Sequence, residues 1–161
     1  MQQVPGEHDY GAATIVVVED DDATRQFLAE NLGADGYAVT TATDAASAER
    51  ALGRCYPDLA IVDLGLPGRD GLELIQNVRR GDRVSSSIDP EMPIVVLSGR
   101  GDELARIRGF AQGCDDYVVK PFSYLELRAR IAAILRRAEH RTRGGRIRIG
   151  PLEIEQLSRR A

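Results

Sequence analysis

The chain has 161 residues, of which 43% are apolar, and this suits one domain with a substantial core better than a disordered chain. It contains no apolar run near the ~20 residues of a membrane span, no signal-peptide pattern at its N-terminus, and too few cysteines, Cys55 and Cys114, for a disulfide framework or a zinc site. Residues 136–161 carry eight arginines against three glutamates, which gives +5 and leaves −9 on the rest of a chain whose net charge is −4. We therefore expect a cytoplasmic protein with no membrane partner, built from an acidic body and a basic tail that form two functional units.

Strands and helices are predicted to alternate along the acidic part. Short apolar, β-branched runs predict buried strands at residues 14–18, 37–41, 59–62, 93–97 and 117–119. Helices are predicted from Asp20–Asp22 to the stop at Gly33 and Gly36, over 44–52, from 70, over 102–112, and from 123, with caps at Asp44, Asp70 and Ser123. Residues 81–92 form a long polar loop to which the sequence assigns no role.

Five strand-helix alternations indicate an α/β domain with a five-stranded parallel sheet. Right-handed crossovers then place helices on both faces of the sheet, which is a doubly wound arrangement. In such sheets the functional crevice lies beyond the carboxyl ends of the strands. The residues that directly follow each strand are therefore the candidates for function.

Polar groups follow four of the five predicted strands. They are Glu19-Asp20-Asp21, Asp63, Ser98-Gly99 and Lys120-Pro121. Neighbouring carboxylates repel one another, and a hard cation such as Mg²⁺ removes that cost. An exposed aspartate beside Mg²⁺, a lysine and a hydroxyl is suited to accept a phosphoryl group. Each group alone also has a structural explanation, as a helix start, a solvated cation, a turn hydroxyl or a cap, but those explanations do not account for their joint placement.

Four ordered motifs resemble the receiver domain of bacterial response regulators. They are Val17-Val-Glu-Asp20, residues 57–71 around Asp63, Val96-Leu-Ser98 and residues 115–122, which read DDYVVKPF. The resemblance covers about residues 14–137. It implies a flavodoxin-like, CheY-like fold with strand order 2-1-3-4-5.

The resemblance also implies a set of site residues. Asp63 would be phosphorylated by a partner histidine kinase, and Glu19 and Asp20 would be the acidic pair that holds Mg²⁺. Asp20 and Asp63 would be direct ligands together with the backbone carbonyl of Gly65. Ser98 and Lys120 would contact the phosphoryl group, Tyr117 would change rotamer on activation, and Lys120–Pro121 would be a cis peptide.

Residues 102–117 and 126–131 are similar to one subfamily, the OmpR/PhoB-type transcription factors. In that subfamily the fourth helix, fifth strand and fifth helix form a symmetric homodimer. By position, Arg106 would pair with Glu126 of the other protomer, and Asp116 with Arg130. The alternative is that these residues form a solvated charged face.

The resemblance predicts four segments. Residues 1–13 would be a flexible arm, 14–138 the receiver domain, 139–145 a linker, and 146–161 the opening strands of a truncated winged-helix domain, because residues 146–155 alternate like a hairpin. The recognition helix lies outside this sequence, so DNA would be bound specifically only through the missing part of the effector domain.

Two positions near Asp63 depart from the usual family pattern. Ser98 replaces a threonine but keeps the hydroxyl. Gly65 replaces a larger side chain that often covers the phosphoryl group, so attacking water would have an open path and phosphorylation would be short-lived. Arg100 is expected to shield part of the same path.

Three classes of function remain open at this point. The favoured class is a phosphorylation switch that catalyses only its own phosphorylation and dephosphorylation. A phosphorylation-independent dimerisation module is an alternative, although such proteins often lose an acidic residue or the lysine. A haloacid-dehalogenase-type hydrolase is a third, against which Gly65 counts, since those enzymes use an acid two residues after the nucleophile.

Overall fold

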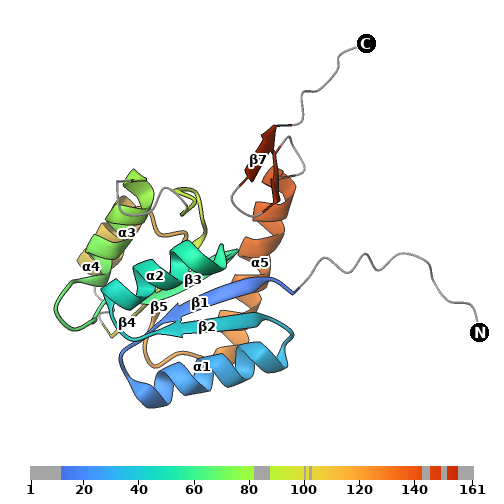
Figure 1. The fold of residues 1–161 in the computed structure, drawn as a ribbon. Helices are drawn as coiled ribbons and strands as arrows, with labels where there is room; N and C mark the ends of the chain where they lie inside the picture. The colour runs from blue at the N-terminus through green and yellow to red at the C-terminus, as the bar shows by residue number, and fades with distance from the viewer. Residues whose placement is uncertain are drawn as a thin grey trace, which may run out of the picture.

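The computed structural model describes residues 12–81, 88–99, 101, 103–142, 146–149 and 152–155. Within them, five parallel strands form one sheet in the order β2-β1-β3-β4-β5 (Figure 1), which confirms the predicted fold. The strands are β1 Thr14–Val18, β2 Ala38–Ala42, β3 Leu59–Asp63, β4 Ile94–Ser98 and β5 Asp116–Val119. The helices between and after them are α1 Asp22–Ala34, α2 Ala45–Cys55, α3 Gly71–Arg80, α4 Glu103–Ala111 and α5 Tyr124–Thr142.

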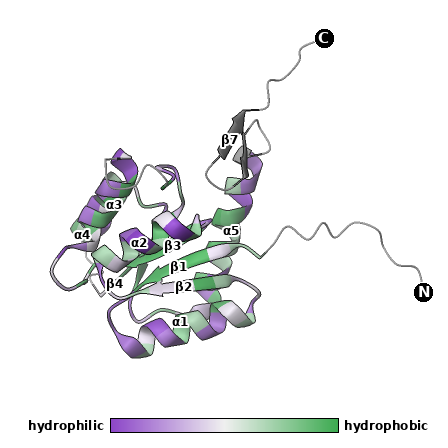
Figure 2. Cartoon of the chain, in the orientation of Figure 1, coloured by the Kyte–Doolittle hydropathy of each residue, from purple (hydrophilic) through white to green (hydrophobic). Residues whose placement is uncertain are grey.

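The sheet separates two hydrophobic cores. On one face Ile15, Val17 and Ile61 pack with buried residues of α1 and α5, and on the other Val16 and Val62 pack with residues of α2 and α3. Every residue of β3 and β4 is buried, and the hydropathy colouring shows the apolar strands enclosed by helices with polar outer faces (Figure 2). A central parallel strand is buried on both sides, which is why its sequence reads as a continuous apolar run.

Aspartates begin three of the helices, as the sequence predicts. The Asp21 carboxylate accepts a hydrogen bond from the backbone N–H of Thr24 at 2.8 Å at the start of α1. Asp44 forms a reciprocal capping box with Ser47 at α2, and Asp70 accepts from the N–H of Leu72 at α3. These bonds satisfy donors that the first helical turn leaves without an intrahelical acceptor.

One helix end differs from the prediction, and the last helix runs past the predicted domain end. Helix α1 runs through Gly33 to Ala34, and the chain turns at Gly36, whose φ of 97° suits glycine. Helix α5 continues to Thr142, four residues past the predicted domain end at 138. Residues 136–142 lack glycine and proline and are rich in good helix formers, so nothing local stops the helix there.

The tail contains the predicted hairpin. Strands β6 Arg146–Ile149 and β7 Leu152–Glu155 pair antiparallel, with Arg146 opposite Glu155. The predicted arm lies almost wholly outside the described residues, and so do residues 82–87 of the loop after α3 and residues 143–145 of the predicted linker. In the described part of the chain, no helix combines the length and the apolar character needed to cross a bilayer.

Arg79 joins three segments at the amino-terminal edge of the sheet. Its guanidinium donates to the backbone carbonyls of Pro90 at 2.8 Å, Met92 at 2.6 Å and Gly113 at 2.9 Å. It also forms an ion pair with Asp115 at 3.1 Å. The end of the loop after α3 and the turn before β5 are therefore both held by a residue of α3.

Candidate functional site

The carboxyl ends of β1 and β3 bring three acidic residues together. Asp63 is the last residue of β3, and Glu19 and Asp20 follow β1, which pairs with β3. One carboxylate oxygen from each of the three lies within 4.8 Å of the other two. Parallel strands end at the same edge of a sheet, so this cluster follows directly from the topology.

The three carboxylates differ in burial. Glu19 is 1% exposed and Asp63 is 6% exposed, whereas Asp20 is exposed. The expectation of an exposed Asp63 is therefore wrong, because it ends the central strand, which is flanked by β1 and β4. Its Oδ1 accepts a hydrogen bond from the backbone N–H of Gly65 at 3.0 Å, which partly offsets the cost of burying the carboxylate.

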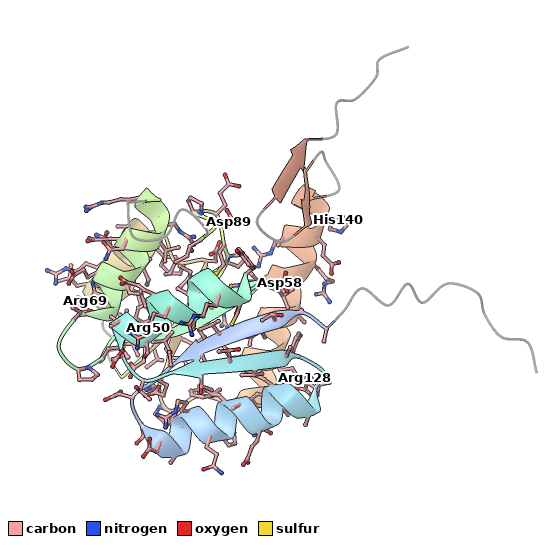
Figure 3. The ribbon with its side chains drawn as sticks, in the orientation of Figure 1. Arg50, Asp58, Arg69, Asp89, Arg128 and His140 are labelled. Atoms are coloured by element: carbon pink, nitrogen blue, oxygen red, sulfur yellow. The ribbon has the colours of Figure 1, made fainter. Side chains whose placement is uncertain are left out.

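The loop after Asp63 is also tied to a neighbouring helix. Arg69 forms an ion pair with Glu49 of α2 at 2.9 Å. Figure 3 labels Asp58 and Arg69, which lie beyond opposite ends of β3, and Asp63 is at the Arg69 end. The phosphoacceptor candidate thus sits on a strand end whose following loop is tied to α2.

Lys120, which directly follows β5, reaches two of the acidic residues. Its Nζ lies 2.7 Å from Glu19 Oε2 and 3.4 Å from Asp63 Oδ2. Burial raises the pKa of Glu19, and the bond from Lys120 only partly opposes this while Asp63 adds to it. Burial by itself would lower the pKa of Lys120, but the Glu19 and Asp63 carboxylates outweigh it and the pKa of the ammonium is raised. One partly exposed cation thus serves two buried acids.

A hollow of about 350 Å³ opens beside Asp63. Ser98, which is 3% exposed, lines it together with Asp63 and Gly65. A Cβ at Gly65 would meet Asp63 Oδ1 at 3.6 Å, which is ordinary van der Waals contact. The hydroxyl-bearing Ser98 and the position without a side chain, Gly65, therefore both line the hollow beside the Asp63 carboxylate. Arg100 lies outside the described residues.

The acidic cluster fits a hard divalent cation. Its donor atoms are all carboxylate oxygens, which are the ligands that Mg²⁺ prefers, and the exposure of Asp20 leaves room for waters. Without a cation, two buried acids share Lys120 as the nearby positive charge. The residues present are therefore suited to Mg²⁺, with Glu19, Asp20 and Asp63 as the available carboxylates.

Tyr117 of β5 is 5% exposed and packs against α4. A Cβ added at Gly109 of α4 would lie 2.9 Å from the ring carbon Cδ2 of Tyr117, so only glycine allows this close approach. The Lys120–Pro121 peptide is cis, as predicted.

The predicted dimer-face residues lie on α4, β5 and α5. Arg130 forms ion pairs within its own chain, with Asp116 at 3.0 Å and with Glu126 at 2.8 Å. Arg106 is exposed on α4. The same helix exposes three large apolar side chains, Leu104 at 57%, Ile107 at 56% and Phe110 at 50%.

Two residues at the site were not anticipated from the sequence. Arg25 of α1 donates to the backbone carbonyls of Glu19 and Asp20, and Arg108 of α4 lines the hollow beside Asp63. An arginine in the first turn of a helix lies at the unfavourable end of the helix dipole, so Arg25 carried a signal that could have been found. The sequence around Arg108 contains no comparable signal, because the position of Arg108 beside the hollow depends on how α4 packs.

Comparison with known proteins now settles the family. The profile described as the response regulator receiver domain matches residues 15–132. The chain belongs to this family. This receiver domain is 42% identical over 146 residues to the phosphate regulon transcriptional regulatory protein PhoB of Rhizobium meliloti, covering 91% of the chain and 62% of that relative. It is 40% identical over 141 residues to the two-component response regulator PhoP of Pseudomonas aeruginosa, covering 88% and 59%.

These relatives confirm the predicted OmpR/PhoB type. The chain spans about 60% of the length of the curated relatives it matches. Among solved structures, a response regulator of Chloroflexus aurantiacus is 35% identical with a TM-score of 0.70, covering 78% of this chain and 99% of that one. The BeF3-activated receiver domain of Klebsiella pneumoniae RstA is 31% identical with a TM-score of 0.68, covering 76% and 98%. The chemotaxis response regulator CheY4 of Vibrio cholerae, 27% identical with a TM-score of 0.69 over 77% and 99%, agrees with the CheY-like fold.

Proposed function

We propose that this receiver domain is a phosphorylation switch in which Asp63 accepts a phosphoryl group from a partner histidine kinase. The observation that carries the proposal is the surroundings of the Asp63 carboxylate. It lies 3.4 Å from the ammonium of Lys120, within 4.8 Å of carboxylate oxygens of Glu19 and Asp20, and beside a hollow that Ser98 also lines.

The chemistry follows from these positions. An Asp63 carboxylate oxygen attacks phosphorus, the P–N bond to the donor histidine breaks, and the ring nitrogen leaves with the electron pair. Lys120 supplies a positive charge and Ser98 a hydroxyl donor for the oxygens of the transferred group. Such a transfer depends mainly on positioning and charge neutralisation, so no separate general base is needed.

Mg²⁺ is the cofactor of this proposal. When bound, it neutralises the charge that gathers between the carboxylates and the phosphoryl oxygens. Glu19, Asp20 and Asp63 would hold it, with the backbone carbonyl of Gly65 as a further ligand. Asp63 then both binds the ion and carries the phosphoryl group.

The output would pass through α4, β5 and α5. Tyr117 lies at the α4–β5 contact, so a shift of Ser98 toward the phosphoryl group would be transmitted to α4 through the tyrosine ring. The three exposed apolar residues of α4 favour a face that a second copy covers. Two ion pairs would then form between protomers, Arg106–Glu126 and Asp116–Arg130. They would either replace the ion pairs that Arg130 makes within one chain or form in addition to them. In the full-length protein, this dimer would place two winged-helix domains on DNA and regulate transcription.

One experiment tests the switch and its output together. The chain is incubated with Mg²⁺ and a small phosphodonor, and intact mass and molecular size are measured over time. We expect a gain of one phosphoryl group and dimer formation, both absent in Asp63→Asn and both suppressed when the metal is chelated. Turnover of many phosphates per chain would indicate the hydrolase class, and a constitutive dimer without mass gain would indicate the phosphorylation-independent module.

A matched pair of variants tests the dimer face. Phe110→Asp on α4 places a charge in the apolar face, whereas Phe27→Asp changes a similarly exposed phenylalanine, 45% against 50%, on α1. Phosphorylated Phe110→Asp should remain monomeric, and Phe27→Asp should dimerise like the wild type. Equal loss or equal retention of the dimer in the two variants would exclude this face.

A further inference from the structure

We propose that Arg25 is a positioning residue for the metal site, because its guanidinium holds the backbone from which Glu19 and Asp20 project. The inference rests on the proposed binding of Mg²⁺ to these acids. It concerns a side chain of α1 that contributes no ligand oxygen.

The contacts of Arg25 converge on the segment between β1 and α1. Its Nη1 donates to the carbonyl of Glu19 at 3.1 Å and to the carbonyl of Asp20 at 3.4 Å. Its Nη2 forms an ion pair with the carboxylate of Asp22. The Arg25 side chain is 19% exposed, whereas that of Asp22 is 90% exposed, so the carbonyl contacts are the inner ones.

Asp20 depends on this backbone anchoring more than Glu19 does. The Glu19 carboxylate is fixed by Lys120 at 2.7 Å and by the backbone N–H of Asp21 at 3.1 Å. The Asp20 carboxylate is exposed, and within the described residues it accepts no hydrogen bond and forms no ion pair. The direction in which Asp20 projects is therefore set by its backbone, and Arg25 holds the carbonyl of that same residue.

The location of Arg25 is costly for the helix by itself. The first turn of a helix carries a partial positive charge, which disfavours a cation there. Four acids at positions 19–22 compensate for this, so one explanation of Arg25 is that it only neutralises them. A second explanation is that its rigid, planar guanidinium holds Nη1 against two successive carbonyls, whereas the ammonium of a lysine has no such fixed geometry.

The two explanations predict opposite effects on Mg²⁺ affinity. A nearby positive charge repels Mg²⁺, so if charge is all that matters, removing it should tighten binding, and Arg25→Lys should bind like the wild type. If ordering of the carbonyls dominates, both Arg25→Gln and Arg25→Lys should bind Mg²⁺ more weakly. Partners that orient metal ligands typically contribute 10- to 100-fold in affinity, and we expect a loss of roughly 10-fold in each variant.

The test is titration calorimetry of Mg²⁺ into the full chain without any phosphodonor. Arg79→Lys is the matched control, since Arg79 is 21% exposed and also donates to backbone carbonyls, but at the amino-terminal edge of the sheet. All variants are measured at a temperature where their circular dichroism matches that of the wild type. A further variant, Asp22→Asn, removes the ion pair of Arg25 but leaves its carbonyl contacts in place.

The expected result is weaker binding in Arg25→Lys and Arg25→Gln, with Arg79→Lys and Asp22→Asn close to the wild type. Tighter binding in Arg25→Gln with unchanged binding in Arg25→Lys would overturn the inference in favour of simple charge compensation. An equal loss in Arg79→Lys would overturn it as general loosening of the fold. A wild type that does not bind Mg²⁺ would refute the proposed metal site itself, which separates that failure from the failure of the Arg25 inference.

Discussion

The ammonium of Lys120 lies 2.7 Å from the carboxylate of Glu19, although 101 residues separate the two in sequence. Glu19 is almost completely buried, and its carboxylate forms an ion pair with Lys120. Lys120 also approaches Asp63 at 3.4 Å, so one positive charge is shared by two acids. The site therefore has an excess of negative charge that suits a divalent cation.

Replacement of Lys120 by methionine should destabilise the domain in metal-free buffer. The buried Glu19 carboxylate loses its cation, and breaking such a pair from one side costs about 3 kcal/mol. Urea denaturation in the presence of a chelator measures the free energy of unfolding. The double variant Glu19→Gln/Lys120→Met should recover the part of the loss that comes from Glu19, because Asp63 is then the one carboxylate of this pair of acids left without Lys120. Lys120→Met with wild-type stability would show that water, and not the lysine, solvates Glu19.

Gly65 is predicted to shorten the life of phosphorylated Asp63. It lines the hollow beside the carboxylate, and a Cβ at this position would meet both Asp63 oxygens at 3.6 and 3.8 Å without a clash. Gly65→Met should therefore fold normally, cover the path of attacking water and lengthen the lifetime. Gly65→Ala, with its shorter side chain, should lengthen it less. The decay of the phosphorylated mass after donor removal is the measurement, and an unchanged or shorter lifetime in Gly65→Met rejects the prediction.

Two glycine-to-alanine substitutions in helices should have opposite effects on stability. At Gly109 the new methyl would lie 2.9 Å from the Tyr117 ring, which should cost about 1–3 kcal/mol and displace the ring. At Gly33 in α1 nothing lies within 4 Å, and alanine should stabilise the helix by about 0.5–1 kcal/mol. Thermal unfolding, with tyrosine fluorescence as a probe of the ring, compares them. Equal changes in stability at the two positions would mean that α4 can shift away from Tyr117 at no cost in free energy.

The Cys114 thiol should make the stability of the fold depend on pH at high pH. Burial raises the pKa of Cys114 from about 9 to about 11, and the neighbouring Asp115 and Asp116 add to this. A pKa raised on folding stabilises the fold fully below pH 9 and loses that effect as the pH rises toward 11. The stability difference between wild type and Cys114→Ala should therefore shrink over this range. Cys55→Ala is the control, and a difference for Cys114→Ala that stays constant with pH contradicts the account.

The fold, and the placement of most candidate site residues at one edge of the sheet, could be predicted from the sequence because both depend on local patterns. Apolar runs of three to five residues predicted the strands. Aspartates at positions 21, 44 and 70 predicted helix starts that the hydrogen bonds confirm. The parallel topology then placed Glu19 and Asp63 at one edge. Residues that follow strands are thus accessible to prediction, since the strand order fixes their neighbours.

Burial and contacts between helices and loops were harder to predict. Asp63 was expected to be exposed because it follows a strand, but it ends the central strand and is covered. The contact of Gly109 with Tyr117 depends on how closely α4 packs, and no local pattern encodes that distance. The end of α5 had no sequence signal, because its last residues are charged but still good helix formers.

The most direct test of the account is to identify the residue that carries the phosphoryl group. The chain is phosphorylated with Mg²⁺ and a small phosphodonor, the acyl phosphate is reduced with borohydride, and peptides are sequenced by mass spectrometry. Homoserine should appear at position 63 and at no other aspartate, and it should be absent when the metal is chelated. Reduction product at Asp20 or Asp21, or none after complete reaction with the donor, would contradict the assignment of Asp63 as the phosphoacceptor.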